Sequence, residues 1–197
     1  MEYSNVYTAP PTIPARAWAL QSASELWKAP EGASGWNLSS DEVQRFSLPS
    51  HAGTSDSESG TGAARILLVE DNSADAGLVR EALEEHGVEG ELLVVIDGEK
   101  ATEFILDVNS QREARPDLVI LDLNLPKRSG YEVLEFLRNS VTWRQVPVVV
   151  LTSSDAKKDR DQAIRLGASR YIRKPFQLEE FISLGAIFKA MLSRPAQ

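Results

Sequence analysis

The sequence predicts an α/β fold in which an open, doubly wound parallel sheet is covered by helices on both faces. Short apolar runs, each long enough for one buried strand, alternate with segments whose apolar residues recur at helical spacing. This alternation occurs five times between residues 63 and 192. The apolar runs also end in polar residues, and the carboxyl ends of parallel strands meet at one edge of a sheet, where ligands bind.

The first two strands and helices follow from apolar runs and local stop signals. The run 65–69 reads as a buried strand, and the helix after it is expected to end at His86, because Gly87 favours a helix stop. A second strand is expected at 91–96, followed by a helix from about Glu99. The remaining expected elements are the strands 118–121, 146–151 and 170–172 and the helices from about 130 to 138, from about 156 to 166, and from 178 to 192.

The chain is divided into two unlike regions near residue 62. The first region holds five of the ten prolines, and the stretch 51–62 is rich in Ser, Gly and Thr, with little to bury. We therefore predict a disordered extension and linker over 1–62, followed by one folded domain over 63–197. A short amphipathic helix over 15–28 and a docking role for Trp18, Trp27 and Trp36 are the alternative.

Charge and composition limit the classes of partner and site. The net charge of -8 disfavours binding to nucleic acid or to an anionic membrane surface. The absence of cysteine excludes disulfides, thiolate metal sites and cysteine nucleophiles. No apolar run is long enough to span a bilayer, and the first residues do not resemble a secretory signal. We expect a cytoplasmic protein.

Polar residues at the strand ends form one candidate site. Asp122 ends the third apolar run, and the others end in Glu70 and Asp71, in Thr152, or in Lys174. Clustered carboxylates repel one another, so they predict a bound cation, and Mg²⁺ prefers such oxygen ligands. A lysine and a hydroxyl beside them suit phosphoryl transfer to an aspartate. Taken singly, each residue has an ordinary structural role as a helix cap, a solvated lysine or a strand-end threonine.

These residues match a family pattern: the region from about 63 to 192 resembles the receiver domain of bacterial two-component response regulators. Members have an acidic pair, an acceptor aspartate, a Thr or Ser, and Lys-Pro after successive strands. Thr152 and Lys174 follow Asp122 by 30 and 52 residues, which is typical of the family. The resemblance implies a flavodoxin-like fold with five strands in the order 2-1-3-4-5 and five helices.

By this resemblance Asp122 is the phosphorylated residue. Asp71, Asp122 and the backbone carbonyl of Asn124 hold Mg²⁺, with Glu70 assisting through water. Thr152 and Tyr171 form the switch pair, and Lys174 balances charge. The Lys174–Pro175 peptide is usually cis in the family.

Details of the pattern indicate a subfamily. The acidic pair is Glu-Asp, Ser129 stands where an aspartate is frequent, and extra residues lie around 104–115. With the sequence Asp-Leu-Asn-Leu-Pro at 122–126, these features are similar to single-domain regulators associated with phytochromes.

The leading hypothesis is a single-domain response regulator of a phosphorelay. It accepts a phosphoryl group from a histidine kinase or a phosphotransfer protein and turns over no separate substrate. Too few residues follow Lys174 for an output domain, so the output is expected to be a switched protein contact, with a homodimer through the fourth helix, fifth strand and fifth helix as one form. The alternatives are a haloacid-dehalogenase-like phosphatase, which would carry its acidic motifs in the opposite order, and a degenerate receiver acting as a scaffold.

Overall fold

Six strands form one sheet in the computed structural model, which describes residues 43–49 and 63–193. The sheet order is β1-β3-β2-β4-β5-β6, and every neighbouring pair is parallel except β1 with β3. The strands are β1 (Gln44–Leu48), β2 (Ala64–Val69), β3 (Gly90–Val95), β4 (Leu118–Leu121), β5 (Val148–Thr152) and β6 (Arg170–Arg173). Leaving β1 aside, the order of the other five is the expected 2-1-3-4-5.

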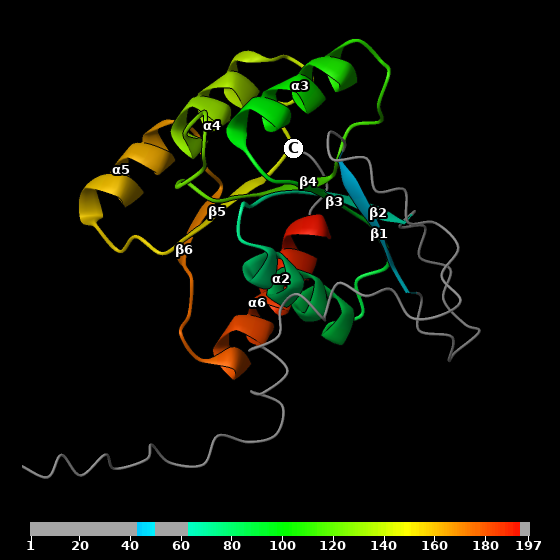
Figure 1. Ribbon diagram of the computed structural model, residues 1–197, viewed down its shortest axis with the longest axis vertical. Coiled ribbons are helices and arrows are strands. Elements are labelled where there is room, and N and C mark those ends of the chain that lie inside the picture. Colours follow the sequence, from blue (N-terminus) through cyan, green and yellow to red (C-terminus); the bar gives the residue numbers. More distant parts are fainter. Residues whose placement is uncertain (1–42, 50–62, 194–197) are drawn as a thin grey trace, which may run out of the picture. The chain divides into compact units, whose positions relative to one another are not determined.

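The helices cover the sheet on both faces (Figure 1). Helices α3 (Gly98–Asn109), α4 (Gly130–Asn139) and α5 (Lys157–Arg165) lie on one face, and α2 (Ser73–Glu85) and α6 (Leu178–Leu192) pack together on the other. Each is separated from the next by a strand, as βαβ connections require. The doubly wound α/β fold predicted from the sequence is confirmed. Among the described residues, no helix has the length and apolar character needed to cross a membrane.

The central strands are almost wholly apolar because both of their faces are covered. All residues of β4 and β5 are buried, and so are the last four of β2 and of β3. Two glycines allow close packing around this core. A Cβ on Gly185 of α6 would lie 2.0 Å from the carbonyl oxygen of Ala82 on α2, and one on Gly130 would lie 2.1 Å from that of Asp122. The second contact brings the start of α4 against the end of β4.

Strand β1 corrects the prediction for the N-terminal region. Residues 44–48 were assigned to a disordered extension, but they pair antiparallel with the outer edge of β3. Phe46 and Leu48 are buried on the α2 side, and the Arg80 guanidinium lies 5.5 Å from the centre of the Phe46 ring. On the other face, Arg45 forms ion pairs with Glu91 and Glu113. The sheet therefore has one strand more than expected, while the suggested helix over 15–28 lies outside the described residues.

Candidate functional site

Two buried carboxylates stand where neighbouring strands end. Glu70 follows β2, and its backbone N–H donates to the Val95 carbonyl at 3.0 Å. Asp122 follows β4, and its N–H donates to the Val69 carbonyl at 3.0 Å. The backbone hydrogen bonds of the sheet thus extend to Glu70 and Asp122, and they fix the positions of the two Cα atoms. Their side chains are only 1% and 5% exposed, so neither charge can be offset by bulk water.

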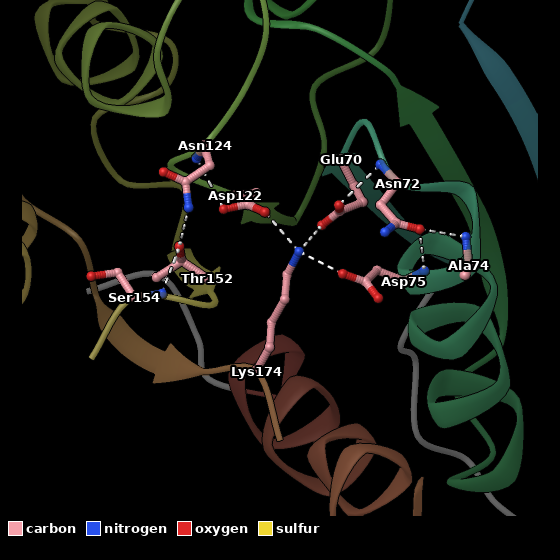
Figure 2. Close-up of polar contacts among 9 residues, drawn as sticks. All are labelled: Glu70, Asn72, Ala74, Asp75, Asp122, Asn124, Thr152, Ser154 and Lys174. Atoms are coloured by element: carbon pink, nitrogen blue, oxygen red, sulfur yellow. Dashed lines mark hydrogen bonds and ion pairs between the residues drawn. The ribbon is translucent and has the colours of Figure 1, made fainter. Parts of the chain in front are cut away.

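The Lys174 ammonium lies among three carboxylates (Figure 2). Its Nζ is 2.6 Å from Asp122 Oδ2, 2.7 Å from Glu70 Oε2 and 2.8 Å from Asp75 Oδ2. Lys174 reaches this position because it follows β6, and its N–H donates to the Thr152 carbonyl at 2.8 Å. One ammonium group therefore contacts three carboxyl groups, so the acidic groups at this site outnumber the cation.

Asp75 belongs to this cluster and was missed in the sequence. It lies in the first turn of α2, where a carboxylate is favoured by the helix dipole. The turn is fixed by Asn72, whose Oδ1 accepts from the Ala74 N–H at 2.9 Å, while Glu70 Oε1 accepts from the Asn72 N–H at 3.1 Å. The sequence did contain a signal for Asp75, because it lies three positions after Asn72, a residue type that favours the N-cap. In the first turn of the helix, Asp75 lies close to the end of β2.

Burial sets the electrostatics of the cluster. Burial raises the pKa of Glu70 to about 7, and the nearby Lys174 ammonium only partly opposes that rise. The pKa of Lys174 is raised in turn: burial works against its charge, but Glu70, Asp122 and Asp75 outweigh that effect. The site therefore favours additional positive charge.

The acidic residues have the geometry of a divalent cation site. Oxygens of Glu70, Asp71 and Asp122 lie within 4.8 Å of one another, and Asp71 is exposed, so the cluster can be reached from solvent. Hard cations such as Mg²⁺ take carboxylate oxygens while keeping several waters. The donor set thus fits the expected metal, with Asn124 next to it: its N–H donates to Asp122 Oδ1 at 3.0 Å.

Thr152 and Tyr171 lie on a path that leads away from the carboxylates. Thr152 is fully buried at the end of β5, and its Oγ1 accepts from Asn124 Nδ2 at 3.4 Å and from the Ser154 N–H at 3.5 Å (Figure 2). The Tyr171 hydroxyl donates to the Ser154 carbonyl at 2.9 Å. Ser154 thus joins the two residues expected to act together.

The Lys174–Pro175 peptide differs from the family expectation. The described part of the chain has no cis peptide bond, so this bond is trans.

Comparisons with known proteins agree with this geometry. The family model for the response regulator receiver domain matches residues 66–184. Response regulator Rcp1 of Synechocystis sp. is 37% identical over 120 residues, which are 60% of this chain and 82% of that protein.

Two solved structures are also similar. The phosphorylated cyanobacterial phytochrome response regulator RcpA is 38% identical, with a TM-score of 0.61 over 66% of this chain and 96% of that one. The Mn²⁺-bound form of response regulator Rcp1 is 32% identical, with a TM-score of 0.61 over 67% and 97% of the two chains.

Proposed function

Because this chain belongs to the response regulator receiver domain family, we propose that it signals by accepting a phosphoryl group on Asp122. The observation that carries the proposal is the set of contacts at Lys174 Nζ, which lies 2.6 Å from Asp122 Oδ2 at the carboxyl edge of the sheet. Homology to single-domain phytochrome response regulators supports a phosphorelay role. The haloacid-dehalogenase alternative has no support from these relatives, and the complete set of polar groups argues against a degenerate scaffold.

The phosphoryl donor is a phosphohistidine on a sensor kinase or a phosphotransfer protein. A carboxylate oxygen of Asp122 attacks phosphorus, a P–O bond forms, and the P–N bond breaks with its electron pair leaving on the imidazole. Catalysis of such a transfer depends on positioning and on charge stabilisation. Asp122 is positioned by the Asn124 N–H on one oxygen and by Lys174 on the other.

Lys174 and Thr152 stabilise the phosphorylated state. The ammonium already contacts the acceptor, so it can neutralise charge on the incoming phosphoryl oxygens. Within the described residues, Thr152 Oγ1 only accepts hydrogen bonds, which leaves its O–H free to donate to the phosphoryl group. Mg²⁺ held by Glu70, Asp71, Asp122 and the Asn124 carbonyl would supply further charge neutralisation.

The readout is a change in protein contacts around Tyr171. Movement of Thr152 toward the phosphoryl group disturbs its bond from the Ser154 N–H and, through Ser154, the bond from Tyr171. Such a modification biases a two-state element without turnover of a separate substrate. A homodimer through α5, β6 and α6 stays a prediction, which light scattering with and without phosphorylation tests.

Incubation with acetyl phosphate and Mg²⁺, followed by intact-protein mass spectrometry, tests the proposal. We expect one phosphoryl adduct on the wild type, none on Asp122→Asn, and none when EDTA removes the metal. A wild type that forms no adduct, or an Asp122→Asn variant that forms as much, would overturn the proposed function.

A further inference from the structure

Asp97 is a buried acidic residue that lies outside the cluster around Lys174. It follows β3 at the carboxyl edge of the sheet, and its side chain is only 4% exposed. One oxygen, Oδ1, accepts from the Lys100 N–H at 2.8 Å and caps α3. The other, Oδ2, lies 2.8 Å from Nζ of Lys127. Asp97 therefore ties the start of α3 to the β4–α4 loop, which comprises residues 122–129.

Lys127 has a backbone conformation that residues other than glycine rarely adopt. Its φ is 65°, and the Arg128 N–H donates to the Pro126 carbonyl at 2.7 Å across it. A hydrogen bond between residues two positions apart defines a γ-turn, and the form with a positive central φ is rare and strained. Such a conformation persists only where surrounding contacts hold it, and the ion pair with Asp97 is one of these contacts.

The start of α3 and the β4–α4 loop are also in close backbone contact. The Gly98 N–H donates to the Pro126 carbonyl at 3.4 Å, and a Cβ on Gly98 would lie 2.0 Å from the Arg128 carbonyl oxygen. Buried Thr102 adds a side-chain contact, because its Oγ1 donates to the Gly98 carbonyl at 2.8 Å and accepts from the Arg128 guanidinium at 3.3 Å. The turn around Lys127 is therefore packed against the first turn of α3.

The same loop carries Asn124, which belongs to the candidate site. Its N–H donates to Asp122 Oδ1 at 3.0 Å, and its carbonyl is a proposed ligand of Mg²⁺. Pro126 lies two residues further along the chain, where its ring fixes its own φ and restricts the backbone of Leu125. Because this connection is short and stiff, a displacement of Lys127 is transmitted to Asn124.

We propose that the ion pair between Asp97 and Lys127 positions the metal site by holding the β4–α4 loop with the Asn124 carbonyl toward the cation. The inference rests on the proposed function, because phosphoryl transfer to Asp122 is the reaction that this cation would serve. Mg²⁺ demands near-ideal octahedral geometry, so its binding is sensitive to a small displacement of one ligand. Asp97 and Lys127 act through Asn124, and they are positioning residues rather than catalytic ones.

Two substitutions break the ion pair from opposite sides. Asp97→Asn keeps an oxygen that can cap α3 and removes the charge, and Lys127→Gln removes the cation. Glu99→Gln is the matched control: Glu99 lies in the same first turn of α3 and 3.5 Å from Nζ of Lys127, but its side chain is 60% exposed. The control removes the same charge as Asp97→Asn, and ion pairs that are exposed to solvent contribute little.

The amide resonance of Asn124 reports the position of the loop without metal, since this N–H donates to Asp122 Oδ1. It is measured in a ¹H–¹⁵N correlation spectrum of the full chain in EDTA. We expect the resonance to shift in Asp97→Asn and in Lys127→Gln and to stay in place in Glu99→Gln. A resonance that does not move in the first two variants would overturn the positioning role.

Binding of Mn²⁺ to the full chain, followed by the EPR signal of the free ion, measures the consequence at the metal. Mn²⁺ prefers the same oxygen ligands as Mg²⁺. We expect Asp97→Asn and Lys127→Gln each to weaken binding about threefold and the double variant to weaken it no further, because the two residues act as one unit. Unchanged affinities, additive effects in the double variant, or an equal loss in Glu99→Gln would contradict the inference.

The two measurements separate the inference from the proposed function. Mn²⁺ binding that is the same in the wild type and the variants would refute the role of the ion pair and leave the phosphoacceptor intact. A wild type that binds no Mn²⁺ would refute the metal site on which the proposed function relies, while the Asn124 resonance still decides whether the ion pair positions the loop. A loss of folding stability alone would identify a purely structural ion pair and overturn the inference.

Discussion

Replacing Glu70 with glutamine tests the electrostatics of the site through the pH dependence of folding. Burial raises the pKa of Glu70 from 4.5 to about 7. The folded state therefore holds the proton of the Glu70 carboxyl more tightly than the unfolded state does. The stability contributed by protonated Glu70 is complete below pH 4.5 and is lost as the pH rises through 7. At about 1.4 kcal/mol per pH unit, the loss amounts to roughly 3 kcal/mol. Glu70→Gln keeps the shape and removes this titration.

Urea unfolding in EDTA at about pH 5 and about pH 7.5 gives the required free energies. Since this window covers most but not all of the titration, the wild type is expected to lose roughly 2 kcal/mol more stability between these pH values than Glu70→Gln does. Added Mg²⁺ should reduce the difference, because a cation favours the ionised carboxylate. Glu81→Gln is the control, since Glu81 is exposed on α2, the helix that follows Glu70 in the chain. Parallel stability curves for Glu70→Gln and the wild type would refute the reasoning.

Three further substitutions probe other parts of the structure, each by urea unfolding. Gly130→Ala should cost about 1 to 3 kcal/mol, because its Cβ would lie 2.1 Å from the Asp122 carbonyl oxygen; an unchanged stability would contradict that close contact. Phe46→Ala should cost about 3 kcal/mol if β1 is part of the folded domain, and exposed Val141→Ala should cost almost nothing. Tyr171→Phe should cost about 1 kcal/mol through the lost bond to Ser154, and a neutral result would exclude that bond.

The meeting of the polar strand ends was predictable because the geometry of a parallel sheet requires it. Glu70, Asp122 and Thr152 each end an apolar run, and such runs can be recognised without knowledge of their partners. Lys174 was predictable for the same reason, because it directly follows the last strand of the sheet. Their roles in phosphoryl transfer remain predictions, whereas their proximity is a property of the fold.

Strand β1 and Asp75 could not be found in this way. Only Phe46 and Leu48 of β1 are buried, and the strand pairs with residues more than forty positions later in the sequence. An edge strand with one neighbour has a weak apolar pattern, and it lies here among Ser and Pro residues. Asp75 is on a helix, so its approach to Lys174 depends on how α2 packs against the sheet rather than on a strand end.

Mapping the phosphorylated residue tests the central claim most directly. The chain is phosphorylated with acetyl phosphate and Mg²⁺, the acyl phosphate is reduced with borohydride, and the peptides are sequenced by mass spectrometry. The account predicts that the reduced residue is Asp122 alone. Modification of Glu70, Asp71 or Asp75 in place of Asp122 would contradict it.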